Sequence, residues 1–597
     1  MEALAPLTVA LPLVVAAVLV AGGRAWPSQW PDAIATLTAA AVAIMAVFLA
    51  GAAAKAGPFA YWFGGWKPRH GAAIGIAFVV DPAGAGCTAF VGALFCASFA
   101  FSWRYFDEVH ARYHALMLIF MAAMAGLALT GDLFNFFVFF ELMSTVAFAL
   151  TGYKLESSAL EGALNFTVTN GIGSFLMLAG IGLVYGRTGA LNFAQLSRAL
   201  AGHPADGLVI LAFTLLIGAL FIKGAIVPFH FWIADAHTVA PSPVCVIFSG
   251  IMVPIAIFGA ARIYWSVFAG AGFDPGLLRP LLVWLGIATA VLGGLVALMQ
   301  RDVKRLLAFS TVSHMGVLLV GVGLLSAQGL AGGMLYLLGH GLVKGALFMV
   351  GGILLAACAG IDEIRLRGAG KGFPVTGLAY AAGGLLLAGL PVGLEHQGRA
   401  LIDAAADARG YAYLAPILSA TGGLTGAGIL RGAGRIFLNL GPEPGIEEQS
   451  PSEEEHDKQD RPVWLMLLPI LALIAADMVL QAFPVEIAVR RAAAVFTASG
   501  PLAATVLDGA AWARPPVPPG ADQVGAIGPI VGLSVALGVA AFELGRSHLP
   551  RFPVRVADLS VGWVFSGLDR IHDGVVGDYV AWLSFGLLVF GGVLAIG

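Results

Sequence analysis

The chain has 597 residues, of which 59% are hydrophobic and only 11% are charged. Soluble domains carry roughly 25% charged residues, so this composition excludes an ordinary soluble protein and indicates a membrane protein. The formal net charge is −3, which gives no support for a nucleic-acid partner.

Apolar segments close to the ~20 residues needed to cross a bilayer recur from one end of the chain to the other. They predict an all-α, multi-pass membrane protein with about sixteen spanning segments. The expected spans are 3–21, 32–54, 84–103, 113–130, 133–153, 162–185, 208–239, 241–266, 278–300, 305–326, 330–357, 374–407, 411–438, 463–484, 525–545 and 577–596. The first has no basic segment before it, so we expect a membrane helix and not a cleaved signal peptide.

Two of these segments, 208–239 and 374–407, are too long and too interrupted to be plain helices. Each has a proline near its middle, Pro228 in the first and Pro391 in the second, and each carries charged residues. Non-helical backbone at membrane depth is tolerated only where protein or a water-filled cavity surrounds it. The two segments are therefore predicted to be broken helices that line a transport site.

Other stretches are predicted to lie outside the membrane. Residues 441–462 are acidic and contain prolines, which indicates a flexible cytoplasmic loop. Residues 510–523 are rich in proline and predict an external connector. An amphipathic interfacial helix is expected within residues 553–574, before the last span.

Lysine and arginine accumulate in the cytoplasmic loops of membrane proteins. With the N-terminus outside, more of the Lys and Arg residues of this chain fall on the cytoplasmic side than on the external side, although Lys55, Lys67 and Arg69 oppose the bias. Lys304 and Arg305 are expected at the cytoplasmic interface as topology anchors. We therefore expect a multi-pass protein of a bacterial inner membrane with its N-terminus outside.

Several ionisable residues occur inside the apolar segments, where each costs about 2.5–3.5 kcal/mol on insertion scales and usually marks an ion pathway. Glu141 lies in the aromatic run FNFFVFFELM, and Lys223 precedes Pro228 in the first interrupted segment. His340 and Lys344 are spaced i and i+4, so they share one helix face. The remaining candidates are His230, Asp235, His237, His314, Glu395, His396 and Arg399.

A buried carboxylate that faces a buried lysine can form a proton relay. Each partner stabilises the charged form of the other while burial favours the neutral forms, so a small movement can transfer a proton. We assign this chemistry to Glu141 with Lys223, and to Lys344, which passes protons on toward His396 or Arg399. Arginine keeps its proton at any working pH, so Arg399 is expected to act as an electrostatic gate.

For several ionisable residues, a purely structural role is the alternative to a role in the proton pathway. A static ion pair is the alternative for Glu141 and Lys223, and a hydrogen-bonded packing role is the alternative for His314. Asp132 and Asp302 fall at the starts of helical segments, where they are expected to cap the first turn.

Four motifs follow one another along the chain: TGDLFNFFVFFELM, FIKGAIVPFHFWIADAHTVAPSPVCVIFSG, RDVKRLLAFSTVSHMG and HGLVKGALF. Together they resemble the antiporter-like membrane subunits shared by Mrp-type cation/proton antiporters, respiratory complex I and membrane-bound hydrogenases. The earlier stretch GGWKPRHGAAIGIAFVVD is similar to the D-type component of the Mrp antiporters in particular. The resemblance covers about residues 60–440.

The resemblance implies about 14 core transmembrane helices in two inverted five-helix repeats, each with one broken helix, plus extra C-terminal helices. It also implies a central hydrophilic axis that carries protons between half-channels. The chain then divides into N-terminal transmembrane helices (1–112), a proton-translocating core (113–440), the acidic loop (441–462) and a C-terminal transmembrane extension (463–597).

The same resemblance implies roles for individual residues. Glu141 matches the key glutamate of the family, Lys223 matches the lysine of its first broken helix, and Lys344 matches the central lysine of the next repeat. The histidines matched are His230 and His237, in the loop after the first broken helix, and His314, in the tenth helix.

The chain departs from the family pattern at two places. Pro254 stands where relatives usually carry a lysine that links the half-channels, and proline removes a titratable group and a backbone donor together. Arg399 stands where relatives usually have a lysine or a glutamate. We therefore expect the outer half of the pathway to be gated, or rebuilt around Glu395 and His396.

The leading hypothesis is a D-type component of an Mrp monovalent cation/proton antiporter, which exchanges protons for Na⁺ or K⁺. The alternatives are a proton-pumping subunit of a complex I-like NADH:quinone oxidoreductase or membrane-bound hydrogenase, and a non-conducting scaffold, suggested by Pro254 and Arg399. The chain has no dinucleotide fingerprint and only four scattered cysteines, so we expect no cofactor, metal or redox site in it. Its expected partners are other membrane subunits and the lipid bilayer.

Overall fold

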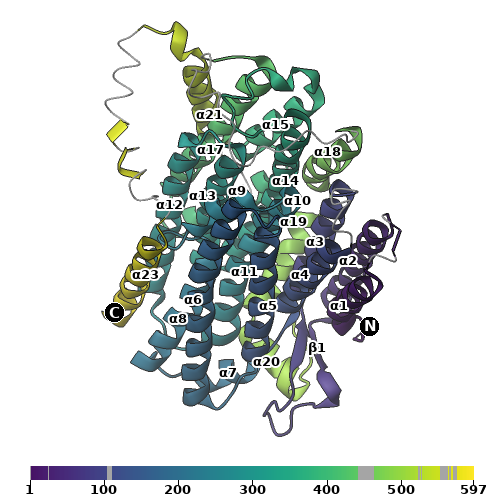
Figure 1. Cartoon of the computed structure of the whole chain (residues 1–597). Helices are drawn as coiled ribbons and strands as arrows, with labels where there is room; N and C mark the ends of the chain where they lie inside the picture. Colours follow the sequence, from purple (N-terminus) through teal and green to yellow (C-terminus); the bar gives the residue numbers. More distant parts are fainter. Residues whose placement is uncertain are drawn as a thin grey trace.

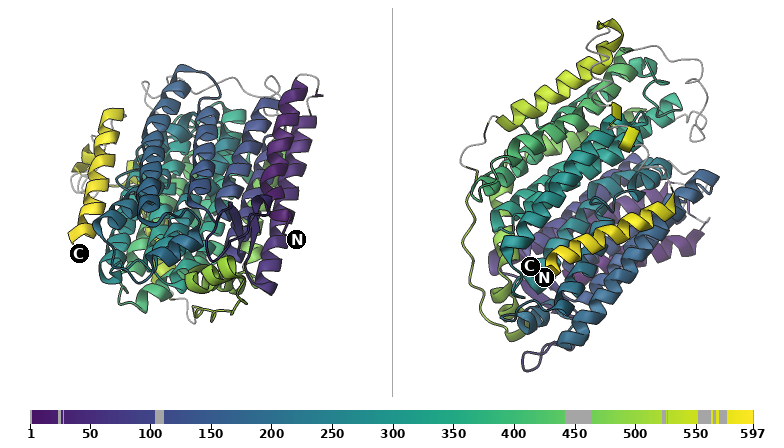
Figure 2. Two further views of the ribbon diagram at one scale, coloured as in Figure 1. Left: turned by 90° about the horizontal axis from the view of Figure 1, so that it is seen from below. Right: turned by 90° about the vertical axis from the view of Figure 1, so that its left-hand side faces the viewer.

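The computed structural model consists mainly of α-helices (Figure 1). It describes residues 2–23, 26–27, 29–103, 111–441, 463–521, 525, 527–550, 562–563, 566–568 and 575–596. Most helices stand side by side and roughly parallel, as the left view of Figure 2 shows. The predicted acidic loop at 441–462 and the predicted interfacial helix at 553–574 lie almost entirely outside the described residues.

Among the described residues, thirteen helices are long and apolar enough to cross a membrane by their length and composition. Their bounds are α1 Leu4–Gly22, α2 Trp30–Ala56, α3 Pro82–Phe101, α4 Ala111–Leu129, α5 Leu133–Thr151, α6 Ser157–Thr188, the composite α10–η3–α11–η4 Ser242–Phe268, α12 Pro275–Met299, α13 Val303–Gly323, α14 Ala327–Cys358, α18 Val463–Leu480, α21 with η7 Ile527–His548, and α23 Val576–Ile596. A further long helix, α17 (Leu414–Leu438), carries Arg431 and Arg435 in its second half. This multi-pass helical architecture confirms the predicted fold class.

Both predicted interruptions occur, and each divides a segment into two half-helices. The half-helices are α8 (Gly207–Lys223) with α9 (Trp232–Val239), and α15 (Pro374–Leu387) with α16 (Leu394–Asp407). Pro228 lies in the first break and Pro391 in the second, as expected for residues that cannot continue the helical hydrogen-bond pattern. In the first break, the indole N–H of Trp232 donates to the carbonyl oxygen of Ile222 at 2.8 Å and so ties the two half-helices together.

Acidic, amide and hydroxyl side chains begin many of the helices, because their oxygen atoms accept backbone amide hydrogens that have no partner within the helix. Asp132 accepts from the amide of Asn135 at 2.9 Å, and Asp302 accepts from the amide of Arg305 at 2.8 Å. These contacts confirm both predicted caps. The same role is taken by Asp81, Asn192, Asp206, Asp274 and Ser326.

Several short elements that the sequence did not lead us to expect gather at one end of the molecule (Figure 1). They are the antiparallel strands β1 (Phe59–Trp62) and β2 (Ala77–Val80), and the helices α7 (Phe193–Leu200) and α20 (Ser499–Asp508). Another such helix, α19 (Val485–Thr497), packs against α14 and α3. Trp62, Ala194 and Leu502 belong to one small buried cluster that joins the hairpin to α7 and α20. An exposed ion pair between Arg198 and Asp508 joins the same two helices.

The last helices pack against the broken segments from outside. In Figure 1, α21 lies beside α17 and α23 lies beside α8. The hydroxyl of Tyr579 in α23 donates to Asp235 Oδ2 of α9 at 3.1 Å. Gly586 of α23 allows close contact with Pro228 and Phe229, because an added Cβ would lie 2.6–2.7 Å from their rings. Helix α23 therefore covers the break between α8 and α9.

Candidate functional site

Lys223 is the last residue of α8 and is fully buried at the first break. Its ammonium nitrogen lies 5.2–5.6 Å from the ring centroids of Phe140, Phe148 and Phe166. Aromatic faces attract a cation at such distances. The nitrogen has no hydrogen-bond partner among the described residues. A buried lysine without an acceptor is free to give its proton to a group that comes within reach.

Glu141 lies in α5, next to Phe140, and its charge acts on Lys223. Its Oε2 atom is buried and has no hydrogen-bond partner among the described residues. Within the described part of the chain, no ion pair of 4.0 Å or less joins Glu141 to Lys223. The carboxylate and the ammonium therefore act on each other through space, and aromatic rings surround the ammonium.

Two histidines lie beyond Lys223 along the chain. His230 is buried in the break, and His237 is fully buried in α9. The His237 ring stacks on Phe348 of α14 with 4.7 Å between ring centroids. Neither ring nitrogen of His237 has a hydrogen-bond partner among the described residues. An apolar stacking partner and unpaired nitrogens leave this imidazole available for proton exchange.

Lys304, the second residue of α13, is buried within the protein. Its ammonium nitrogen donates to the carbonyl oxygens of Thr238, at 2.9 Å, and Ala240, at 3.0 Å. These carbonyls lie at the end of α9, where helical carbonyl oxygens lack internal partners. A lysine there satisfies them and complements the helix dipole. The tertiary contact between α13 and α9 decides the position of Lys304.

Lys344 stands in the middle of α14 and is fully buried. Its ammonium nitrogen donates to the carbonyl oxygen of Leu307 and to the hydroxyl of Ser310, both at 2.7 Å. The Lys344 charge acts on His237 beside the first break and on His340 one helical turn away in α14. Lys344 is therefore close enough to act electrostatically on residues from both parts of the predicted pathway.

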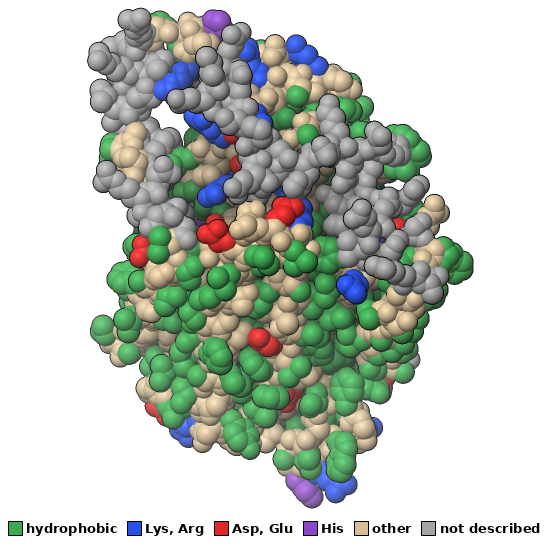
Figure 3. All heavy atoms as spheres, viewed as in Figure 1, with side chains coloured by type: hydrophobic (Ala, Val, Ile, Leu, Met, Phe, Trp, Pro, Cys, Tyr) green, Lys and Arg blue, Asp and Glu red, His purple; other side chains and the backbone are tan. Residues whose placement is uncertain are grey.

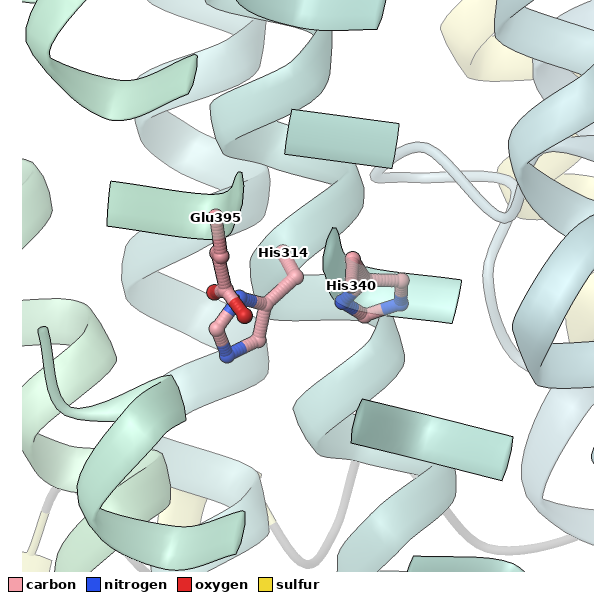
Figure 4. A group of neighbouring side chains, drawn as sticks. All are labelled: His314, His340 and Glu395. Carbon is pink, nitrogen blue, oxygen red and sulfur yellow. The ribbon is translucent and has the colours of Figure 1, made fainter. Parts of the chain in front are cut away.

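Glu395, His314 and His340 meet at the start of α16 (Figure 4). Glu395 Oε1 lies 3.1 Å from His314 Nδ1, and the Tyr336 hydroxyl lies 2.6 Å from the same nitrogen. The His340 ring lies beside His314, with 5.1 Å between ring centroids. The sequence places these residues on three helices, and the fold brings them together. The contact gives His314 ionisable neighbours on two sides, which a simple packing role does not require.

Arg399 and His396 line a cavity of about 720 Å³ next to this cluster. The cavity runs from exposed Asp407 to buried Glu395, so it connects the cluster with the surface. The Arg399 guanidinium pairs with Asp403 at 2.9 Å and donates to the Ala415 carbonyl oxygen at 2.8 Å. A fixed positive charge thus lines the wall of the cavity. In Figure 3, hydrophobic side chains (green) cover most of the lower half of the visible face, and Lys and Arg (blue) are more frequent in the upper half.

Asp477 is a buried carboxylate that was not among the residues selected from the sequence. It lies in α18, and its Oδ1 atom accepts the amide hydrogen of Leu394, the first residue of α16, at 3.0 Å. Gln481, one turn later, accepts the amide hydrogen of Gly393 at 2.8 Å. Helix α18 therefore caps α16 from outside its own segment, directly before Glu395. A lone aspartate in the apolar run VWLMLLPILALIAADMVL was the available signal.

We expect Asp477→Ala to destabilise the start of α16. The variant leaves the buried amide of Leu394 without an acceptor, which costs about 1–3 kcal/mol. Thermal unfolding in detergent, followed by the reaction of buried cysteines such as Cys87 and Cys245 with a thiol-specific dye, measures the loss. Asp477→Asn keeps an oxygen acceptor and should unfold near the wild-type temperature. Equal stability of the alanine variant would contradict the capping role.

The predicted residues thus form two groups. The first surrounds the break after α8 and contains Glu141, Lys223, His230 and His237. The second surrounds the start of α16 and contains His314, His340, Glu395, His396 and Arg399, with Lys344 between the groups.

Pro254 lies near the start of α11, directly after the π-helical turn η3 (Phe248–Met252), and is buried.

Two further sets of buried ions lie outside this pathway. Arg262 of the α11–η4 segment pairs with Asp81 at 2.5 Å, and its guanidinium lies 4.0 Å from the ring centroid of Phe496. Glu363, in the loop after α14, pairs with Arg431 at 2.8 Å and with Arg435. Both sets hold helices together where spans meet loops, so they have an evident structural role.

Comparison with known proteins identifies the family of the chain. Residues 130–425 match the family described as "NADH:quinone oxidoreductase/Mrp antiporter, TM". The chain is 31% identical over 461 residues to the N component of the NADH-quinone oxidoreductase of Desulforudis audaxviator. The matched region covers 75% of this chain and 90% of that protein. It is 30% identical over 336 residues to the D component of the Na⁺/H⁺ antiporter of Bacillus subtilis, with 55% of this chain and 66% of that protein covered.

A solved structure of the Mrp complex from Dietzia sp. DQ12-45-1b contains a similar chain. The match has a TM-score of 0.71 and 27% identity, and it covers 86% of this chain and 98% of the other. Both broken helices and most of the buried ionisable residues lie within the family match. The protein is a member of the NADH:quinone oxidoreductase/Mrp antiporter transmembrane family.

Proposed function

We propose that the protein is a proton-translocating subunit of a multisubunit complex in a bacterial inner membrane, with its N-terminus outside. The observation that carries the proposal is the series of buried ionisable groups that runs from Glu141 and Lys223 through Lys344 to Glu395. Each such group costs free energy at membrane depth, and membrane proteins retain them where ions move.

In this proposal, Glu141 and Lys223 load protons at the first break. The Lys223 ammonium has no hydrogen-bond acceptor among the described residues, so a proton can leave it when a neighbouring group moves. His237 and Lys344 carry the proton to the second group of residues. His314 and Glu395 then release it into the cavity that Arg399 lines. Arg399 keeps its charge and acts as the electrostatic gate of this exit.

The role that we favour within the family is that of a D-type component of an Mrp antiporter, which exchanges protons for Na⁺ or K⁺. The similarity to the D component of the Na⁺/H⁺ antiporter of Bacillus subtilis and to a chain of the Dietzia Mrp complex supports it. In this role the chain acts together with other membrane subunits, since it resembles a component of a larger complex.

A second role has support of similar weight. The N component of an NADH-quinone oxidoreductase matches over 90% of its own length. In that setting another subunit carries out the redox reaction, and this chain moves protons in response. The two roles share the pathway described above and differ in what drives it: a cation gradient in the first, and electron transfer in the second.

The proposal predicts that Glu141→Gln and Lys223→Met reduce proton flux to the background level. Each variant removes one ionisable group and keeps the approximate volume of the side chain. Flux is measured in inverted vesicles that contain the whole complex, with a fluorescent pH probe, after addition of Na⁺ or K⁺ and separately after addition of NADH. A response to the cation identifies the antiporter role, and a response to NADH alone identifies the redox-driven role.

Two exposed residues provide matched controls for this experiment. Glu161→Gln and Lys371→Met change the same residue types on the surface and should leave the flux unchanged. Full activity of the Glu141 and Lys223 variants would reject the relay. Absence of any flux in the wild-type complex would favour the third possibility, a scaffold that Pro254 and Arg399 have made non-conducting.

A further inference from the structure

Three side chains with metal-binding atoms converge in the core of the protein, and each comes from a different helix. His314 lies in α13, His340 in α14 and Glu395 in α16. One ring nitrogen from each histidine and one carboxylate oxygen all lie within 4.8 Å of one another. Figure 4 shows the Glu395 carboxylate directed toward the His314 ring, with the His340 ring beside it.

Close helix packing makes this convergence possible. Gly339 precedes His340 in α14, and a Cβ added to it would lie 2.3 Å from the backbone nitrogen of Glu395. A Cβ on Gly398 of α16 would lie 2.3 Å from the backbone nitrogen of Tyr336. Both glycines therefore allow α14 and α16 to approach closely enough for the carboxylate to reach the two imidazoles.

Several of the potential ligand atoms make no hydrogen bond to any of the described residues. Both ring nitrogens of His340 and the Oε2 atom of Glu395 are buried and lack hydrogen-bond partners there. The exposed fractions of the residues are 0% for His340 and 5% for Glu395. Leaving such groups unsatisfied costs about 1–3 kcal/mol each, so a ligand that satisfies them would be stabilised.

The surroundings also supply an outer shell and an entry route. His314 Nε2 lies 3.2 Å from the Thr425 hydroxyl, which can accept its N–H when Nδ1 binds a metal. Glu395 and Tyr336 line the 720 Å³ cavity that reaches exposed Asp407, so an ion and a water molecule can enter from the surface.

We propose that His314, His340 and Glu395 bind a borderline transition-metal dication of the Zn²⁺ class. Two imidazoles and one carboxylate form the three-residue set found in open zinc sites, which keep a fourth position for water. Metal–ligand bonds of about 2.0–2.2 Å would bring the ligand atoms to roughly 3.3 Å from one another. Rotation of the Glu395 side chain toward His340 provides the contraction from the present separation.

One neighbouring charge opposes the metal. The Lys344 charge acts on both His314 and His340, and it repels a dication at the same place. Replacing it with the neutral, similarly long side chain in Lys344→Met should therefore strengthen metal binding. An increase in metal affinity in Lys344→Met, where the ligand variants lower it, distinguishes binding at this cluster from adventitious binding to distant histidines.

The test is a Co²⁺ titration of the full chain, purified in detergent through an affinity tag without histidine. We expect one Co²⁺ per chain, with the visible absorption of a four- or five-coordinate ion, displaced by Zn²⁺ but not by Mg²⁺. Glu395→Gln and His340→Gln should each weaken binding at least tenfold, and Thr425→Val about tenfold through loss of the outer shell. His203→Ala, at an exposed histidine, should leave the binding unchanged.

Two results would overturn the site: no visible absorption in the wild type, or equal Co²⁺ affinity in all ligand variants. The thiol-dye unfolding assay identifies any variant that has not folded. If the ligand variants do not fold, Thr425→Val still tests the site, because it retains all three ligands and should bind Co²⁺ about tenfold more weakly. Binding is measured without transport, so it is independent of the proposed function. Where that function holds, Zn²⁺ should also slow proton flux, because it occupies groups of the pathway.

Discussion

Glu363→Ala is expected to lower the free energy of unfolding by about 3–5 kcal/mol, because it leaves two buried guanidinium groups without their carboxylate. Glu363 pairs with Arg431 at 2.8 Å and with Arg435, and all three residues are buried. Arg431 also donates to the carbonyl oxygens of Leu298 and Gln300, both at 2.6 Å, at the end of α12. Loss of Glu363 therefore weakens the junction of α12 and α17 as well as the ion pairs.

Thermal unfolding with the thiol-specific dye measures this loss. An exposed pair supplies the control: Arg187 and Asp206 lie 3.1 Å apart with both side chains 47% exposed. Arg187→Met should change the stability by about 1 kcal/mol or less. Arg431→Lys should be nearly as damaging as Glu363→Ala, since one ammonium cannot reach the carboxylate and both carbonyls with the geometry of a guanidinium. Wild-type stability in both buried variants would show that these ions are solvated.

Asp81→Ala is expected to cause a loss of similar size. Its Oδ2 atom pairs with buried Arg262 at 2.5 Å, and its Oδ1 atom accepts the amide hydrogens of Ala83 and Gly84 at 2.9 Å. The variant removes a helix cap, worth about 0.5–2 kcal/mol, and leaves a buried charge, worth about 3–5 kcal/mol. Unfolding in detergent should occur at a clearly lower temperature than in the wild type.

A double-mutant cycle separates the cap from the charge. Asp81→Asn keeps an oxygen for the cap and removes the charge, while Arg262→Met removes the other charge and keeps an apolar side chain near Phe496. The double variant should be more stable than the sum of the two single losses predicts, because no unpaired charge remains buried. Strict additivity would show that Asp81 and Arg262 do not interact energetically.

The features that could be predicted well depend on residues close together in the chain. The spans follow from local apolar composition, the breaks from Pro228 and Pro391, and the caps from Asp132 and Asp302 at helix starts. The positions that could not be predicted depend on packing between distant helices. Asp477 meets Leu394 across 83 residues, and nothing in either local sequence specifies that meeting.

Lys304 illustrates the same limit for a residue whose contacts could not be predicted. A lysine between an apolar segment and a loop is commonly found at the membrane interface. Here the end of α9 presents unpaired carbonyl oxygens to it, and two hydrogen bonds compensate for its burial. Most of the candidate pathway residues are buried as expected, since an ionisable residue inside an apolar run is unusual in itself. Their grouping around two breaks required the fold.

The contact between α23 and the first break has a consequence for biogenesis. Tyr579 meets Asp235 across 344 residues of sequence, and Gly586 lies against Pro228 and Phe229. While the chain is being synthesised, the irregular backbone after Lys223 enters the bilayer long before α23 does. Until then, that backbone lacks the cover that α23 supplies, and lipid cannot satisfy polar backbone groups. The order of membrane insertion therefore makes the first half of the pathway one of the last parts of the protein to mature.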